Sequence, residues 1–208
     1  MSGAITFNPF LTTSPANSFL LETQGYVQGT AYDDPSVRME LAGGTLASTE
    51  TLVMWGGVPI EEFINVTGAG SDNTGPALKR ATTAATTTGW SVSDQAGSMV
   101  IVPGPSAPVA SVGSYVSFYR NGSNIRIAVQ ADPALVSALV SADGSITSQA
   151  LYWDVTNYRL TLTTTGGNWA LPTTARLLSV NTNSKIISYN SGTGAVTWTA
   201  GDAAIILI

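Results

Sequence analysis

The feature that most constrains the fold is a series of short runs, rich in β-branched and aromatic residues, that begins after Gly89. Turn-forming pairs such as Asn121-Gly122 and Asp143-Gly144 separate the runs. Many short strands at close spacing predict an antiparallel β-sandwich or barrel. The expected strands are residues 90–92, 99–102, 115–120, 125–130, 151–155, 159–163, 177–180, 185–189, 195–199 and 203–208.

One short helix is expected to interrupt these strands. Asp132 supplies an N-cap and Pro133 the favoured residue of the first helical position. The apolar residues that follow recur at helical spacing for about two turns. They are Leu135, Val136, Leu139 and Val140.

Two hairpins are predicted from turn residues and alternation. The Asn121-Gly122 pair is the strongest short-range hairpin signal, and it follows the alternating run 115–120. Residues 151–162 alternate on both sides of Thr156-Asn157, so Asp154 and Arg159 are expected to pair across the turn. Such a partly exposed ion pair contributes under ~1 kcal/mol and favours a structural role.

The N-terminal part has a different texture. Residues 25–60 are apolar and rich in threonine, carry two Gly-Gly pairs, and show no clear helical or strand period. They predict an extended arm that lies on another surface, with Pro59 restricting any local strand to a sheet edge. The expected organisation is an arm over 1–67, a linker with a possible short helix at 76–85 over 68–88, and a β-domain over 89–208.

Composition excludes much chemistry. Charged residues make up 10% of the chain, against roughly 25% in ordinary soluble domains. The formal net charge of −5 argues against nucleic-acid binding. Without cysteine or histidine there is no disulfide, no thiolate nucleophile and no imidazole base. The N-terminus does not resemble a secretory signal and no run approaches the ~18 apolar residues of a membrane span, so we expect a protein that folds in a cytoplasm and does not bind membranes.

The remaining candidates for catalysis have simpler interpretations. Neighbouring carboxylates, as in Asp33-Asp34 and Glu61-Glu62, point to opposite faces of an extended chain. The glycines of residues 68–75 lack the Gly-Lys-Ser/Thr of a phosphate-binding loop. The five tryptophans suit core or interface anchors better than carbohydrate stacking. We therefore expect no catalytic residue, no metal, no cofactor and no enzyme.

Several ordered blocks carry a family resemblance. They are TAYDDPSVRMELAGGTLASTETLVMWGGVPI (residues 30–60), GWSVSDQ (89–95) and SYVSFYRNGSNIRIAVQADPALV (114–136), with looser similarity in YWDVTNYRL (152–160) and the terminal GAVTWTAGDAAIILI. In these blocks the chain resembles the head structural cement proteins, or capsid decoration proteins, of tailed bacteriophages. Residues 1–17 and 68–75 show no such similarity.

The resemblance implies a virion protein on the outer surface of the capsid, which binds the major capsid protein and bridges capsomers. It agrees with the low charge and the predicted arm, because many weak contacts repeated around a shell act together. We expect self-association as a trimer or a dimer around a capsid symmetry axis. The expected capsid contacts are Tyr32, Leu41, Gly43, Gly44, Leu46, Leu52, Met54, Trp55, Gly56, Gly57 and Ile60.

Two alternatives remain open. A tail or baseplate structural protein, or a receptor-binding module, shares the all-β texture and low charge. A carboxylate-dependent glycan hydrolase needs two acidic side chains facing each other across a cleft at about 5–9.5 Å, and no acidic motif at strand ends suggests one.

Overall fold

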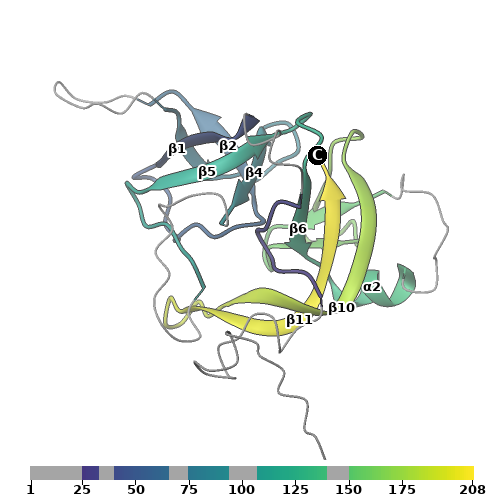
Figure 1. Cartoon of the computed structure of the whole chain (residues 1–208). Coiled ribbons are helices and arrows are strands. Elements are labelled where there is room, and N and C mark those ends of the chain that lie inside the picture. Colours follow the sequence, from purple (N-terminus) through teal and green to yellow (C-terminus); the bar gives the residue numbers. More distant parts are fainter. Residues whose placement is uncertain (1–24, 33–39, 66–74, 94–106, 140–149) are drawn as a thin grey trace, which may run out of the picture.

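The computed structural model describes residues 25–32, 40–65, 75–93, 107–139 and 150–208. Within these ranges the protein is mainly β with one short helix, which confirms the predicted fold class. Figure 1 shows a small barrel on one side and the long β10–β11 hairpin on the other. The expected strand at 99–102 and the turn at Asp143-Gly144 lie outside the described residues.

Five strands close into a barrel in the order β1-β3-β2-β4-β5. β1 and β3 run parallel, and every other neighbouring pair in the barrel is antiparallel. Closure leaves these strands without a free edge. The five strands are β1 (Ala42–Leu46), β2 (Pro59–Phe63), β3 (Ala77–Arg80), β4 (Gly89–Val92) and β5 (Tyr115–Arg120).

The prediction of an extended arm is wrong for residues 40–65. β1 and β2 belong to the barrel, where they pair with strands from the expected linker and the expected β-domain. Pro59 does not mark a sheet edge either, because β2 lies between β3 and β4. It is the first residue of its strand, a position that a residue without an N–H tolerates.

The possible short helix at 76–85 is also wrong. Residues Ala77–Arg80 form β3, which pairs with β1 on one side and β2 on the other. Two ladders of hydrogen bonds thus outweigh the local preference of the alanines for a helix. The threonine-rich residues after Arg80 form the turn that leads into β4.

A second sheet has three antiparallel strands in the order β10-β11-β6. Its members are β6 (Arg126–Gln130), β10 (Arg176–Tyr189) and β11 (Val196–Leu207). The four strands expected between residues 177 and 208 are two long ones. The irregular residues around 181–184 are absorbed as a register shift inside the ladder rather than a turn.

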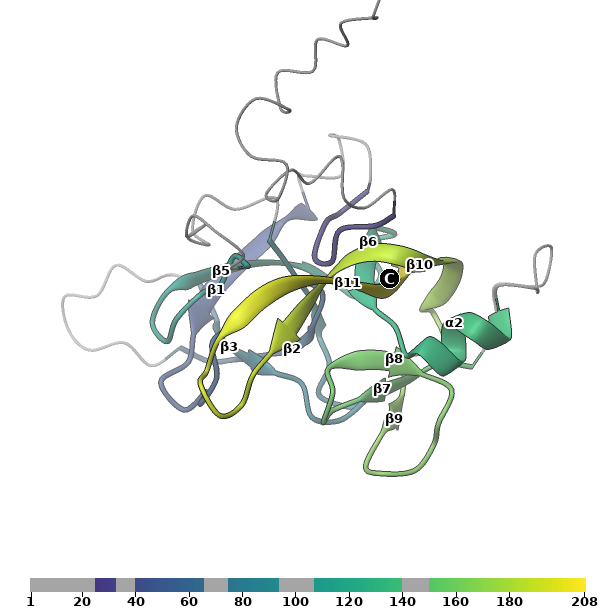
Figure 2. The ribbon, with the colours of Figure 1, turned by 90° about the horizontal axis from the view of Figure 1, so that it is seen from below.

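A third, small sheet has the order β8-β7-β9 and lies beside the helix α2 (Figure 2). Its strands are β7 (Tyr152–Asp154), β8 (Arg159–Thr161) and β9 (Trp169–Ala170). The β7–β8 hairpin is confirmed, with Asp154 opposite Arg159 and 3.7 Å between Oδ2 and Nε. Asp132 Oδ2 lies 3.1 Å from Arg159 Nη2, so the guanidinium joins this sheet to the start of α2.

The predicted helix is confirmed as α2 (Pro133–Leu139), with Leu135 and Val136 fully buried. Asp132 Oδ1 accepts a hydrogen bond of 2.9 Å from the Ala134 N–H, as an N-cap does. Val140 lies outside the described residues.

The hairpin expected around Asn121-Gly122 is not formed. A turn is present there, but both edges of β5 are taken by β1 and β4, and β6 pairs instead with β11. The Asn-Gly turn therefore carries the chain from the barrel to the second sheet. A turn signal fixes the backbone locally, whereas strand pairing depends on which distant edges are free.

One hydrophobic core joins the three sheets. Trp90 of β4 meets Trp153 of β7 edge to face, with 5.2 Å between ring centroids. Trp55 stacks on Tyr189 of β10 at 5.4 Å and meets Tyr158 edge to face at 5.3 Å. Four of the five tryptophans are buried and Trp198 is half-buried, so the interpretation of the tryptophans as anchors within the protein fits their positions.

Candidate functional site

Four of the expected capsid-contact side chains lie in the protein's own core. Leu46, Met54, Trp55 and Ile60 are at most 2% exposed. They pack against the other strands of the barrel and the second sheet, so in this fold they are not available to a partner. We correct their assignment from capsid contacts to core residues.

Three further apolar residues of that set are half-buried: Tyr32, Leu41 and Leu52. The Tyr32 hydroxyl accepts a hydrogen bond from the Val27 N–H at 2.9 Å. Leu41 packs against the core just before β1. Leu52 presents its carbonyl to Arg80, as described below, so all three also have roles within the chain.

The glycines of the set permit close approaches inside the protein. A Cβ at Gly43 would overlap the side chain of Tyr115, whose ring lies over this glycine on the outside of the barrel. A Cβ at Gly56 would come within 2.7 Å of Gly29 Cα. The close neighbours of these glycines are the chain's own residues, and Gly44 and Gly57 are buried.

Among the described residues, exposed apolar side chains that could contact a partner lie on one outer face of the barrel. Tyr115, Thr45, Ala77 and Phe63 are directly opposite one another in register across β5, β1, β3 and β2. Residues paired in this way share a face, so these four side chains form a row. Tyr115 is 50% exposed and Phe63 40% exposed.

Two more exposed apolar residues lie close in sequence to the ends of this row. Ile64 follows Phe63 at the end of β2, and Val112 precedes β5. They are 91% and 48% exposed, respectively. We call these four residues the barrel patch: Phe63, Ile64, Val112 and Tyr115. Outside it, the only large hydrophobic side chain that is exposed in the described ranges is Leu178 on β10.

Sequence reasoning missed the barrel patch. The residues looked like ordinary strand positions or parts of an arm, and their exposure depends on which side of the barrel the second and third sheets cover. The alternation of Tyr115, Ser117 and Tyr119 was visible, but Tyr119 on the same face is 1% exposed because the core extends over it.

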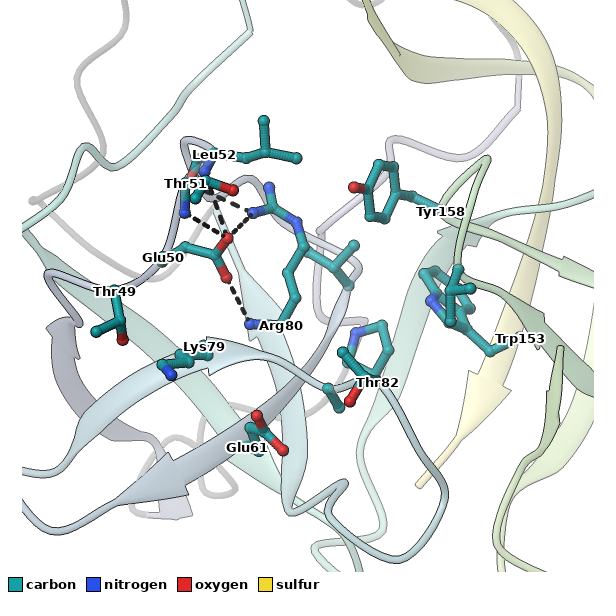
Figure 3. Close-up of a pocket in the computed structure, with 14 residues that line it drawn as sticks. Thr49, Glu50, Thr51, Leu52, Glu61, Lys79, Arg80, Thr82, Trp153 and Tyr158 are labelled. Atoms are coloured by element: carbon teal, nitrogen blue, oxygen red, sulfur yellow. Dashed lines mark hydrogen bonds and ion pairs between the residues drawn. The ribbon is translucent and has the colours of Figure 1, made fainter. Parts of the chain in front are cut away.

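A cavity of about 330 Å³ lies between the barrel and the third sheet. Figure 3 shows Glu50 and Arg80 on one side of it, and Tyr158 and Trp153 on the other. Glu61, Lys79 and Thr82 also line the cavity. Lys79 and Glu61 are opposite each other on β3 and β2.

Arg80 is the most constrained side chain of this cavity. Its guanidinium donates to the carbonyls of Leu52 and Val53, and its Nη1 lies 3.4 Å from Glu50 Oε1. Its Cζ is 4.5 Å from the ring centroid of Trp55 and 5.2 Å from that of Tyr158. The Arg80 Nε, although buried, has no hydrogen-bond partner among the described residues.

Backbone N–H groups hold the Glu50 carboxylate in place. Its carboxylate accepts hydrogen bonds from the backbone N–H groups of Thr51, Leu52 and Arg80 at 3.0, 3.3 and 2.9 Å. Burial lowers the pKa of the Arg80 guanidinium, and the Glu50 carboxylate opposes that shift. Glu50 and Arg80 therefore form a buried pair whose charges depend on each other.

A second, smaller cavity of about 250 Å³ is also lined by Tyr158. Asn157, Arg159 and Tyr189 are among its lining residues. Tyr158 itself has a left-handed backbone, with φ of 54°, at the end of the β7–β8 turn. Burial raises the pKa of its hydroxyl. This strained residue lines both cavities.

The described residues also bear on membranes and metals. No helix there is long and apolar enough to cross a bilayer. In the same ranges, acidic side chains do not gather in threes that could ligate a metal ion.

These features define a mainly β protein built on a closed five-stranded barrel, with an exposed apolar patch on the barrel and a cavity between the barrel and the third sheet. The chain matches no family model, and neither the curated proteins nor the solved structures contain a significant match to it.

Proposed function

We propose that the protein decorates and cements a tailed-phage capsid, binding the outside of the major capsid protein shell and bridging capsomers. The sequence blocks that resemble capsid cement proteins supply the class of partner. The barrel patch is the structural observation that supports the proposal, because exposed apolar side chains gathered on one face mark protein interaction sites.

The contact residues in this proposal differ from those expected from sequence. Phe63 and Tyr115 take the place of Trp55 and Ile60 as apolar anchors, because only the former pair is exposed. Aromatic anchors on a rigid sheet lose little conformational entropy when they bind, so they suit repeated, individually weak contacts. The low charge of the chain favours such apolar docking over electrostatic attachment.

Capsid binding by matched variants tests the proposal. We expect Phe63→Ser to lower the affinity for expanded capsids by roughly tenfold or more, as the loss of an interface anchor does. Leu178→Ser is the control, because Leu178 is 39% exposed and Phe63 40%, but Leu178 lies on a different sheet. Co-sedimentation with capsids measures both affinities, and the thermal unfolding of each variant shows whether it remains folded.

Electron microscopy of particles that carry the protein decides its location. Density for the barrel patch against the outer surface of capsid subunits supports the proposal. Density on the tail or baseplate instead would establish the structural or receptor-binding alternative. Equal capsid binding by Phe63→Ser and Leu178→Ser would remove the barrel patch from the interface.

A further inference from the structure

The cavity beside Arg80 has chemistry that capsid attachment does not use. Its walls are Tyr158 and Trp153 on one side and Glu50, Arg80, Lys79 and Glu61 on the other (Figure 3). Its volume of about 330 Å³ falls at the lower end of the ~300–1,000 Å³ typical of small-molecule sites. A ligand of one or two small rings fits this size.

The balance of charges in the cavity disfavours an ionic ligand. Two cationic side chains, Lys79 and Arg80, line it together with two carboxylates, Glu50 and Glu61. Arg80 is already paired with Glu50, while the Lys79 Nζ lies over the Phe63 ring, 4.8 Å from its centroid. The two cations and two carboxylates leave the cavity without a net formal charge, so desolvating an ion there would cost free energy.

The same groups exclude a purely apolar ligand. Such a ligand would desolvate the carboxylates, the ammonium group and the hydroxyl of Thr82 without replacing their hydrogen bonds. The Arg80 Nε would also remain without an acceptor. The Arg80 side chain is only 7% exposed, and a buried donor without an acceptor is unfavourable.

From these contacts we infer that the cavity binds a neutral saccharide unit. Sugar hydroxyls both donate and accept, so they can satisfy carboxylates, an ammonium group and a threonine hydroxyl around one cavity. A ring oxygen or hydroxyl can accept from the Arg80 Nε. The C–H face of a pyranose can pack on the ring of Tyr158, which is half-buried. This inference is independent of the capsid proposal, because it depends on the cavity alone.

Titration of the isotopically labelled full chain with sugars tests the inference. The probes are glucose, galactose, N-acetylglucosamine and maltose, each added to about 50 mM, which nearly saturates a site with a Kd of about 1 mM. We expect at least one probe to cause saturable shifts in the backbone resonances of Glu50 and Thr82. The Arg80 Nε–H resonance should shift with them, because it reports directly on a new acceptor.

Two variants locate the site. We expect Thr82→Val and Glu61→Gln each to weaken binding at least about fivefold, the loss of one ligand hydrogen bond. Thr174→Val is the control, because Thr174 is also an exposed threonine and does not line the cavity. The spectrum of each variant without sugar shows whether its fold is retained.

The sugar titrations can support or overturn the saccharide site. Binding that falls in Thr82→Val and Glu61→Gln but not in Thr174→Val supports the saccharide site. Absence of saturable shifts with all four probes overturns it, as does binding that these two variants leave unchanged. None of these results depends on capsids, so the failure of one proposal leaves the other standing.

Discussion

The role of a single residue in this protein depends more on its burial than on the chemistry of its side chain. Trp55 precedes Gly56-Gly57 in a segment that looked like an arm, yet it is 2% exposed and packs between Arg80 and Tyr189. Substitution of Trp55 should therefore affect folding before it affects any partner. Core aromatic residues truncated to alanine typically cost about 3–5 kcal/mol.

Arg80 offers a direct test of a buried charge pair. We expect Arg80→Met to lower the free energy of unfolding by about 3–5 kcal/mol, because Glu50 would be left buried without its partner. Urea denaturation measures the change. The matched control is Arg120→Met, which breaks the pair with Glu62 at 2.7 Å.

That control should have a small effect. Arg120 is 57% exposed, and exposed ion pairs contribute under about 1 kcal/mol. Equal losses in Arg80→Met and Arg120→Met would contradict the view that burial determines the effect. The Glu50→Gln, Arg80→Met double variant should recover part of the loss, because neither side then carries an unpaired charge.

At the scale of elements, the helix α2 was predictable because its signals are local. Asp132 caps its first turn and Pro133 starts it, while Leu135 and Val136 face the core. The strand β3 was not predictable, because its alanine-rich surroundings favour a helix and only pairing with β1 and β2 makes it extended. Local propensity determines the secondary structure of a segment only when its tertiary contacts are few.

The two roles of Asp132 can be separated by substitution. Asp132→Asn keeps an N-cap side chain but removes the charge that faces Arg159 at 3.1 Å, so it should cost under about 1 kcal/mol. Asp132→Ala removes both roles and should cost about 1 kcal/mol more. Thermal unfolding followed by circular dichroism measures the difference. Similar losses in the two variants would show that the cap contributes little.

The whole molecule depends on strands from both halves of the chain. β4 and β5 come from the expected β-domain, while β1, β2 and β3 come from the segments expected as arm and linker. The core joins all three sheets through contacts such as Trp90 with Trp153. Residues 25–32, 40–65 and 75–88 are therefore part of the folded unit.

A fragment tests this dependence. We expect residues 89–208 alone to give a poorly dispersed NMR spectrum and no cooperative unfolding transition, because β4 and β5 would lose three of the barrel's five strands. The full chain is the control. A well-dispersed spectrum from the fragment would show that the second and third sheets fold without the barrel.

The sequence alone determined the β class, the helix at Asp132-Pro133 and the β7–β8 hairpin. Each depends on residues close together in the chain, namely alternation, a cap or a turn. The tertiary structure alone decided that residues 40–65 complete a barrel, that β5 and β6 have different partners, and that the exposed anchors are Phe63 and Tyr115. Backbone hydrogen bonds and burial in these places come from strands distant in sequence, which a local pattern does not specify.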